Sequence, residues 1–367
     1  MTVSFTLPRW HDLHAHFRQG EPMAAYIKAH LAMGCAGILA MPNTKPPVSK
    51  VFDKDNGDGW SIEGYTTQLM KAGADAFDNV IVPLYLTKDT TPAMIEAGAK
   101  AGILKAAKYY PPHGTTNADF GQPLQSYIDN GVLKAMADHG VTLCIHGEEH
   151  GLSGPAYFDA TTNAEDIFYR ERLPRVVDAM ASLKIVCEHI TTATAAGFVT
   201  NCGDSVSATV TPQHLLYTVG HLVQRMKYHL YCLPLVKFES DRAALRAAVT
   251  SDKNTKFFAG TDSAPHTTKA TDCGCAAGCF TGFIAPQLYA QAFEESGVDL
   301  GDKKGQDIFI NFLSLNGPRF YGLKPSLKTF KLTRTPQSVP ELKTADGPVV
   351  ALPRGMGHDT VPWTLEL

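Results

Sequence analysis

The chain has 367 residues, of which 44% are hydrophobic and 19% charged, and its formal net charge is −3 at neutral pH. This composition supports a large apolar core and excludes a disordered chain. There is no long Lys/Arg run, and no apolar stretch approaches the ~20 residues that span a bilayer, so we expect neither nucleic acid nor a membrane as a partner. The first residues lack the pattern of a signal peptide, and we expect a cytoplasmic protein.

Short β-rich runs alternate with helical stretches, which is the pattern of a parallel sheet with crossover helices. We predict strands at Arg9–His16, Gly37–Met41, Val80–Leu86, Ile103–Tyr109, Val141–His146, Lys184–His189, Ser205–Thr211 and Phe257–Asp262. We predict helices at Met23–Met33, Pro92–Ala101, Leu124–His139, Ala164–Ser182 and Asp241–Thr250. Eight such strands favour an α/β fold closed as a (β/α)8 TIM-type barrel over an open sheet, and no glycine-rich nucleotide fingerprint follows the first strand.

The chain continues beyond the eighth predicted strand. We predict helical structure at Gly282–Glu295 and in the segment Asn311–Gly322. Residues from about 324 onward are rich in proline, and we predict that they form a C-terminal tail packed on the barrel rather than a second domain. Residues 1–367 are therefore expected to form one domain.

The segment Asp12-Leu13-His14-Ala15-His16-Phe17-Arg18 contains the first candidate metal ligands. His14 and His16 are two residues apart on a predicted strand, so their side chains point to the same face. Neutral imidazole is a good ligand for zinc and its neighbours. A lone pair of this kind is weak evidence, and it gains weight from further candidates later in the chain.

Four later residues each end a predicted strand: Lys108, His146, His189 and Asp262. The C-terminal ends of barrel strands meet at one mouth, so we expect these side chains to converge there. With His14 and His16 they exceed the three protein ligands of a single catalytic zinc, which favours two metal ions. An ammonium cannot ligate a metal, whereas a lysine carbamylated by CO2 is an anionic group that can bridge two ions.

Each candidate also has an ordinary structural interpretation. Lys108 could be an ion-paired lysine, Asp262 could cap the next helix, and His189 could be a buried, hydrogen-bonded histidine. His214 lies near the end of the seventh predicted strand, and we favour a packing role because the ligand set is complete without it. Arg18 could pair with a nearby carboxylate, although its position beside His16 favours a role in the site.

The eight cysteines do not indicate a disulfide framework in a chain of this size, and we expect reduced thiols. Cys144 and Cys187 precede His146 and His189 by two residues, and we interpret them as buried fillers. The cluster of Cys273, Cys275 and Cys279 offers three sulfurs without an obvious fourth ligand, so we favour a Gly/Ala-rich loop over a structural zinc site.

Several longer motifs identify a family. From about Pro8 to Leu323 the chain resembles the shorter, bacterial-type dihydroorotases of the amidohydrolase superfamily. The motifs that carry this resemblance are the segment from Asp12 to Arg18, Met41-Pro42-Asn43-Thr44, Ala106-Ala107-Lys108, Thr115-Thr116-Asn117, His146-Gly147-Glu148, Glu188-His189-Ile190-Thr191, Thr211-Pro212-Gln213-His214, Tyr231-Cys232-Leu233-Pro234 and Gly260-Thr261-Asp262-Ser263-Ala264-Pro265-His266.

The resemblance implies a zinc enzyme that interconverts N-carbamoyl-L-aspartate and L-dihydroorotate in pyrimidine (UMP) biosynthesis, as a homodimer. It implies that His14, His16 and Asp262 bind one Zn²⁺ and that His146 and His189 bind the other. Carbamylated Lys108 (N6-carboxylysine) and a hydroxide would bridge the two ions, and Asp262 would shuttle the proton.

The resemblance also implies a set of substrate contacts: His16, Arg18, Asn43, Thr115, Thr116, His146, Leu233, His266, Ala276, Ala277 and Gly278. Arg18, Asn43 and His266 would hold the substrate carboxylate, and a loop with Thr115 and Thr116 would close over the substrate. Two alanines stand between Cys275 and Gly278 where the family pattern has one, so the alanine that meets the ring is ambiguous.

Two rival functions stay open at this point. The first is another cyclic-amide hydrolase of the superfamily, such as a hydantoinase or an allantoinase, whose neutral ring offers no carboxylate to Arg18, Asn43 and His266. The second is a metal-free barrel that serves as a scaffold. The complete set of expected ligands disfavours the scaffold.

Overall fold

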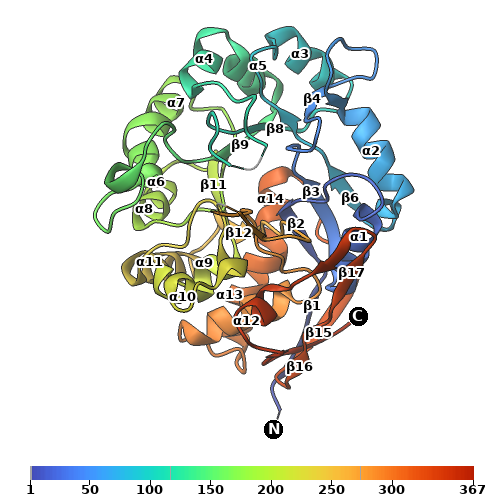
Figure 1. Ribbon diagram of the computed structural model, residues 1–367, viewed down its shortest axis with the longest axis vertical. Helices are drawn as coiled ribbons and strands as arrows, with labels where there is room; N and C mark the ends of the chain where they lie inside the picture. The colour runs from blue at the N-terminus through green and yellow to red at the C-terminus, as the bar shows by residue number, and fades with distance from the viewer. Residues whose placement is uncertain (1, 116, 273) are drawn as a thin grey trace.

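The computed structural model describes residues 2–115, 117–272 and 274–367. Parallel strands surround the centre of the molecule, and helices lie outside them (Figure 1). Within the described residues the barrel has eight strand positions, in the order β2 (Trp10–Ala15), β3 (Cys35–Ala40), β6 (Asn79–Ile81) continued by β7 (Leu84–Tyr85), β8 (Ala106–Tyr109), β9 (Thr142–His146), β10 (Ile185–Glu188), β11 (Val206–Val210) and β12 (Phe257–Ala259). This order confirms the predicted (β/α)8 barrel.

The barrel closes between its first and last strands. A parallel bridge joins Ala15 to Ser263, and the Asp262 N–H donates to the His14 carbonyl oxygen at 2.8 Å. The one break in the predicted strand Val80–Leu86 falls at Val82-Pro83, where proline has no N–H to offer the ladder. The barrel strands β2, β3 and β8–β12 are buried along their whole length, as expected for a parallel sheet covered on both faces.

Helices cover the outside of the barrel and its ends. Their bounds are α1 (Met23–Ala32), α2 (Ile62–Lys71), α3 (Pro92–Lys100), α4 (Leu124–Asp129), α5 (Val132–His139), α6 (Ala164–Ile167), α7 (Leu173–Ala179), α8 (Ala193–Asn201), α9 (Pro212–Leu216), α10 (Val219–Val223), α11 (Glu239–Val249), α12 (Ala285–Glu295), α13 (Lys303–Ile310), α14 (Asn316–Tyr321) and α15 (Leu352–Gly355). Two π-helical turns, Phe168–Arg172 and Asn311–Leu315, join α6 to α7 and α13 to α14.

Two predicted helices differ from the observed ones. The stretch Leu124–His139 forms α4 and α5, because Gly131 between them adopts the left-handed conformation at φ 79°. The stretch Ala164–Ser182 is interrupted by the π-helical turn before Pro174, a residue that cannot donate to a continuous helix. The helices α2, α8, α9, α10, α13 and α15 lie outside the predicted set.

The two ends of the chain meet in a small antiparallel sheet. β15 (Thr329–Thr333) pairs with β1 (Ser4–Pro8) on one side and with β20 (Thr364–Glu366) on the other. Trp363 is buried, and its Nε1–H donates to Glu294 Oε2 of α12 at 2.9 Å. The C-terminal segment also contains β16 (Gln337–Ser338), β17 (Leu342–Thr344), β18 (Gly347–Val349) and β19 (Thr360–Val361).

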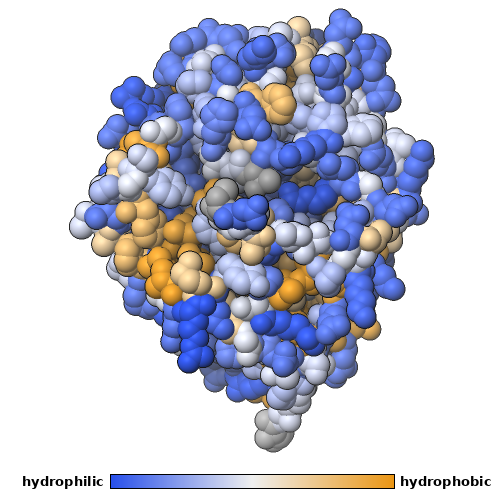
Figure 2. Space-filling view, in the orientation of Figure 1, coloured by the Kyte–Doolittle hydropathy of each residue, from blue (hydrophilic) through white to orange (hydrophobic). Residues whose placement is uncertain are grey.

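The face seen in Figure 2 is mostly hydrophilic, with apolar residues gathered over α9, α10 and α11. Among the residues described, no helix combines the length and the apolar character needed to cross a bilayer.

Candidate active site

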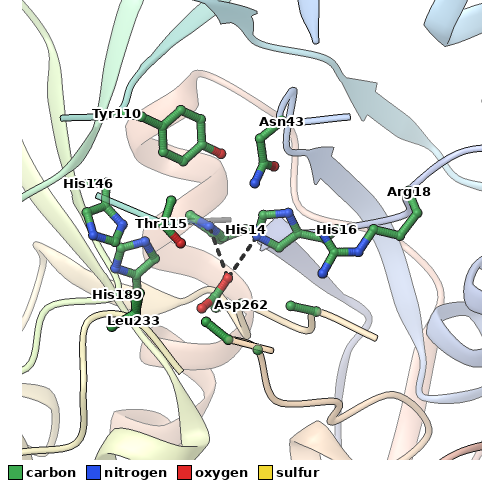
Figure 3. Close-up of a pocket in the computed structure, with 13 residues that line it drawn as sticks. His14, His16, Arg18, Asn43, Tyr110, Thr115, His146, His189, Leu233 and Asp262 are labelled. Atoms are coloured by element: carbon green, nitrogen blue, oxygen red, sulfur yellow. Dashed lines mark hydrogen bonds and ion pairs between the residues drawn. The ribbon is translucent and has the colours of Figure 1, made fainter. Parts of the chain in front are cut away.

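A small cavity opens at the C-terminal ends of the barrel strands (Figure 3). It is lined by His14, His16, Arg18, Asn43, Tyr110, Thr115, His146, His189, Leu233, Asp262, Ala264, Ala277 and Gly278. Residues separated by about 250 positions in the chain therefore share one cavity, because they stand at the ends of barrel strands or on the loops that follow those strands.

The first cluster consists of His14, His16 and Asp262. Their nearest ligand-type atoms all lie within 4.8 Å of one another. His14 Nε2 and His16 Nε2 are 3.4 and 2.9 Å from Asp262 Oδ1. The two histidines reach the same side because they are two residues apart at the end of β2, as the alternation of strand side chains predicts.

The second cluster adds His146, His189 and Lys108. The His189 ring lies between the other histidines, with its centroid 4.7 Å from that of His14 and 4.8 Å from that of His146. Lys108 is completely buried, and within the described part of the chain its Nζ has no hydrogen-bond partner. An amine without a partner in such a place is costly unless another group binds there.

Backbone strain is concentrated at this site. His189, Asp262 and Arg18 have φ angles of 40°, 49° and 56°, in the left-handed region that side chains other than glycine rarely adopt. His189 and Asp262 stand just after β10 and β12, so this turn of the backbone aims their side chains into the cavity. Conformations of this kind persist where the surrounding structure holds them, and they cluster at functional sites.

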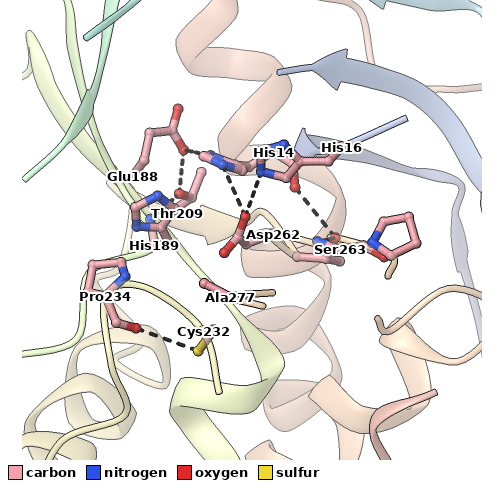
Figure 4. A network of polar contacts seen from close by, with 12 residues as sticks. His14, His16, Glu188, His189, Thr209, Cys232, Pro234, Asp262, Ser263 and Ala277 are labelled. Carbon is pink, nitrogen blue, oxygen red and sulfur yellow. Dashed lines mark hydrogen bonds and ion pairs between the residues drawn. The ribbon is translucent and has the colours of Figure 1, made fainter. Parts of the chain in front are cut away.

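Glu188 lies beside His14 and contacts the ring of that candidate ligand (Figure 4). It is buried and accepts a hydrogen bond from His14 Nδ1 at 2.7 Å and one from Thr209 Oγ1 at 2.6 Å. A carboxylate on the far nitrogen of a histidine fixes the ring and its tautomer, which is the usual arrangement behind metal ligands. The sequence motif contained Glu188, but no role was predicted for it.

Burial and the contacts between histidines and carboxylates set the pKa values of the site residues, and therefore their charges. Burial acts against protonation of His14, but Glu188 and Asp262 raise its pKa overall. Burial lowers the pKa of His16 to about 4 and that of His189 well below its ordinary value. Burial works against ionisation of Asp262, yet hydrogen bonds from His14 and His16 hold its pKa well below the usual range.

The donor atoms fit divalent metal ions. When His14 gives up the Nε2 proton that it donates to Asp262, its Nδ1–H still donates to Glu188, and the Nε2 lone pair then faces Asp262, a second electron-pair donor. A cation between them satisfies both, and imidazole with carboxylate suits zinc. Burial lowers the pKa of Lys108, which favours the neutral amine that CO2 can carbamylate.

The opposite side of the cavity carries the predicted substrate contacts. Arg18 is partly buried, and its Nη2 lies 3.1 Å from His266 Nε2. That His266 nitrogen is also 2.8 Å from the Ala277 carbonyl oxygen, to which it donates when protonated. Asn43 is buried and lines the cavity. These residues form a polar corner beside His16.

The other predicted contacts are placed as follows. Thr115, Leu233, Ala277 and Gly278 line the cavity, whereas Ala276 does not and instead pairs through its backbone with Lys269. His266 lies behind Arg18 in an adjoining cavity. Thr116 lies outside the described residues, as does Cys273 of the cysteine cluster.

Three further residues lie near the site. A packing role was predicted for His214, and no role was predicted for Tyr110 or Glu148. His214 is buried, with Nδ1 2.8 Å from Thr211 Oγ1 and Nε2 3.1 Å from the Pro234 carbonyl oxygen, and it does not line the cavity. Tyr110 lines the cavity above Lys108, and its position two residues after a predicted ligand could have indicated it. Glu148 Oε2 lies 2.8 Å from His146 Nε2.

No family model matches the chain. A dihydroorotase of Shewanella amazonensis is 41% identical to it over 346 residues, which cover 92% of both proteins. A dihydroorotase of Marinobacter nauticus is 40% identical over the full length of both. Among solved structures, the dihydroorotase of Saccharomyces cerevisiae in complex with 5-fluoroorotic acid has a TM-score of 0.86 at 26% identity, covering 99% of this chain and 98% of that one. A D-hydantoinase of Thermus sp. shares the fold, with a TM-score of 0.70 at 13% identity over 99% and 83% of the two chains.

Proposed function

Since this chain belongs to the dihydroorotase family, we propose that its barrel cavity holds two zinc ions and interconverts N-carbamoyl-L-aspartate and L-dihydroorotate. The chain is a hydrolase that acts on a cyclic amide C–N bond. The observation that carries the proposal is the meeting, in one cavity, of four histidines and Asp262, with Arg18 on the opposite side. The buried Lys108 lies just behind this surface, with its Nζ 5.0 Å from the ring centroid of the lining residue Tyr110 and without a hydrogen-bond partner among the described residues.

The residues divide into two ligand sets in this proposal. His14, His16 and Asp262 would hold one ion, His146 and His189 would hold the other, and carbamylated Lys108 would bridge them. Two such ions, when bound, polarise a carbonyl oxygen and make a water acidic enough to attack at neutral pH. Glu188 keeps His14 in the tautomer that presents Nε2 to the cavity.

Asp262 moves the proton. During hydrolysis the water oxygen forms a bond to the ring amide carbon, and the bond from that carbon to the ring nitrogen breaks. Asp262, ionised at neutral pH, accepts the water proton and then gives it to the departing nitrogen. The reverse path forms the ring. Because ring opening creates a carboxylic acid that ionises, higher pH favours hydrolysis and lower pH favours cyclisation.

Arg18 recognises the substrate. Its guanidinium lies between His16 and His266 at the edge of the cavity, where a fork of N–H donors matches a carboxylate. Hydantoins and allantoin are neutral rings that give this arginine no carboxylate to bind. The arrangement therefore favours a substrate with a carboxylate beside the ring.

A spectrophotometric assay of L-dihydroorotate hydrolysis with metal-replete protein tests this function. Turnover of dihydroorotate well above that of hydantoin and allantoin is the expected result. Preferential turnover of a neutral ring would contradict the proposed substrate, and absence of turnover for all three rings would contradict the proposed chemistry.

Three further parts of the proposal concern the whole protein; the homodimer rests on the resemblance, and the other two rest on the sequence pattern. We propose that the protein acts in the cytoplasm, that residues 1–367 form one domain with the segment from about 324 packed on the barrel, and that the enzyme is a homodimer.

A further inference from the structure

Lys269 carries a buried ammonium that no carboxylate partners in the described structure. Its side chain is 7% exposed, and its Nζ donates to three backbone carbonyl oxygens: Tyr231 at 2.9 Å, Ala276 at 2.5 Å and Gly278 at 2.6 Å. An ammonium has three donors, and all three are used.

These carbonyls belong to two backbone segments, 231–233 and 276–278. The two segments form the wall of the cavity on the side away from the candidate metal ligands. Tyr231 stands two residues before Leu233, and Ala276 and Gly278 flank Ala277. Figure 4 shows Cys232, Pro234 and Ala277 together below His189 and Asp262. Lys269 therefore ties together the two segments that form this wall.

One backbone hydrogen bond joins these two segments directly, and a second joins the 276–278 segment to Lys269 itself. Gly278 N–H donates to the Tyr231 carbonyl oxygen at 2.9 Å, and Ala276 N–H donates to the Lys269 carbonyl oxygen at 2.8 Å. Three carbonyl oxygens directed at one point repel one another unless a positive donor lies between them. Removing the ammonium would push the 231–233 and 276–278 segments apart.

The wall has little room to adjust without moving the cavity surface. Gly278 has φ +142°, and a Cβ on it would lie 2.7 Å from Ala264 Cβ and 3.0 Å from His266 Nε2. Any shift of this segment is therefore transmitted to His266, which faces Arg18.

We propose that Lys269 is a positioning residue, whose ammonium fixes the backbone at Leu233 and Ala277 so that the cavity fits the substrate ring. The proposal rests on the proposed function, because it names the dihydroorotate ring as the group that this wall meets. Lys269 touches no reacting atom, so its loss is expected to affect binding more than the chemical step.

A second lysine with the same bonding provides a matched control. Lys256 Nζ donates to the carbonyl oxygens of Val199 at 3.2 Å, Gly203 at 2.9 Å and Cys202. Lys256 stands just before β12, at the end of the barrel opposite the cavity. The carbonyl groups that it binds lie in the last turn of α8 and just beyond it. Lys256→Met removes an equivalent three-carbonyl contact without touching the cavity wall.

The experiment compares steady-state kinetics of wild type, Lys269→Met and Lys256→Met, each with its metal content measured. We expect Lys269→Met to raise the KM for dihydroorotate about tenfold or more while kcat falls less than about threefold. Lys256→Met should leave both constants within about twofold of wild type. An unchanged KM in Lys269→Met, or an equal rise in Lys256→Met, would overturn the proposal.

Two additional measurements separate positioning from other effects. Loss of simple charge attraction for an anionic substrate would be screened at about 0.5 M salt, so a KM ratio that collapses there argues against positioning. Amide hydrogen exchange gives a readout without turnover: peptides covering residues 274–279 should exchange faster in Lys269→Met and not in Lys256→Met. Equal exchange in both variants would refute the positioning role. Because exchange is measured without turnover, this result is independent of whether the wild type hydrolyses dihydroorotate. If Lys269→Met fails to fold, Lys269→Gln should show the same changes at smaller size.

Discussion

Lys108 is the site residue whose chemical state depends most on another group, the CO2 that would carbamylate it. Its Nζ is buried near His14, His146 and His189, lies 5.0 Å from the Tyr110 ring centroid and has no hydrogen-bond partner within the described residues. A buried ammonium in that position would repel metal ions, whereas a carbamate would bind them. The chemistry of this single side chain therefore decides whether two ions can be bridged.

Carbamylation of Lys108 is testable by spectroscopy. Protein reconstituted with ¹³C-bicarbonate should show a carbamate carbon signal that is absent from Lys108→Ala. Lys108→Arg should lose nearly all activity, because a guanidinium cannot become an anionic bridge. Full activity in Lys108→Arg would exclude the bridging role.

A second prediction at the scale of one residue concerns the replacement of Arg18. Loss of a charge-assisted pair costs about 1.5–3 kcal/mol, so Arg18→Met should lower kcat/KM for dihydroorotate at least about tenfold. The loss should be smaller for an uncharged cyclic amide assayed in parallel. Equal losses on both rings would mean that Arg18 supports the site without binding the carboxylate.

The sequence indicated some of these residues better than others. His14 and His16 follow from strand alternation, and the strand ends pointed to Lys108 and His146. Alternation would place Glu188 and His189 on opposite faces. Both nevertheless serve the site, because His189 leaves the strand with φ 40° while Glu188 stays on β10 and reaches His14. A local change of backbone conformation of this kind has no clear signal in one sequence.

At the scale of elements, the barrel strands were predictable because short β-rich runs alternate with helical stretches along the chain. The helix α2 was not, since its sequence contains a glycine and two adjacent threonines that weaken helix propensity. Its start is nevertheless marked by Ser61, whose hydroxyl accepts from Gly64 N–H. Tertiary packing, with Ile62, Tyr65 and Leu69 buried, completes the helix.

The loop after β10 depends on one acid from α6. Glu165 Oε1 accepts from the N–H groups of Thr191 and Thr192 at 2.8 and 3.1 Å. Burial raises the pKa of Glu165 from 4.5 to about 7, even though Lys237, 4.0 Å away, acts to lower it. The folded state therefore holds a proton that the unfolded state releases at lower pH.

This difference predicts a pH dependence of stability. The contribution of Glu165 is complete below about pH 4.5 and is lost as pH rises through about 7, a change of about 3 kcal/mol in the free energy of unfolding. Urea unfolding of wild type and Glu165→Gln across this range measures it. The variant should lack that part of the decline, and parallel curves for the two proteins would contradict the assignment.

At the scale of the whole molecule, closure of the barrel assembles the site. His14 and His16 stand near the start of the chain and Asp262 follows the last barrel strand, yet the bridge between Ala15 and Ser263 brings them into contact. The sheet of β1, β15 and β20 then joins both ends of the chain outside the barrel. The site thus forms only when the complete barrel has closed.

The metal content of the purified enzyme tests the central claim most directly. Inductively coupled plasma mass spectrometry on fully active protein should give close to two divalent ions per chain, mainly zinc, and Lys108→Ala should retain fewer. Removal of the ions with a chelator should abolish dihydroorotate hydrolysis, and added zinc should restore it. One ion per fully active chain, unchanged by added metal, would contradict the proposed pair of bridged ions.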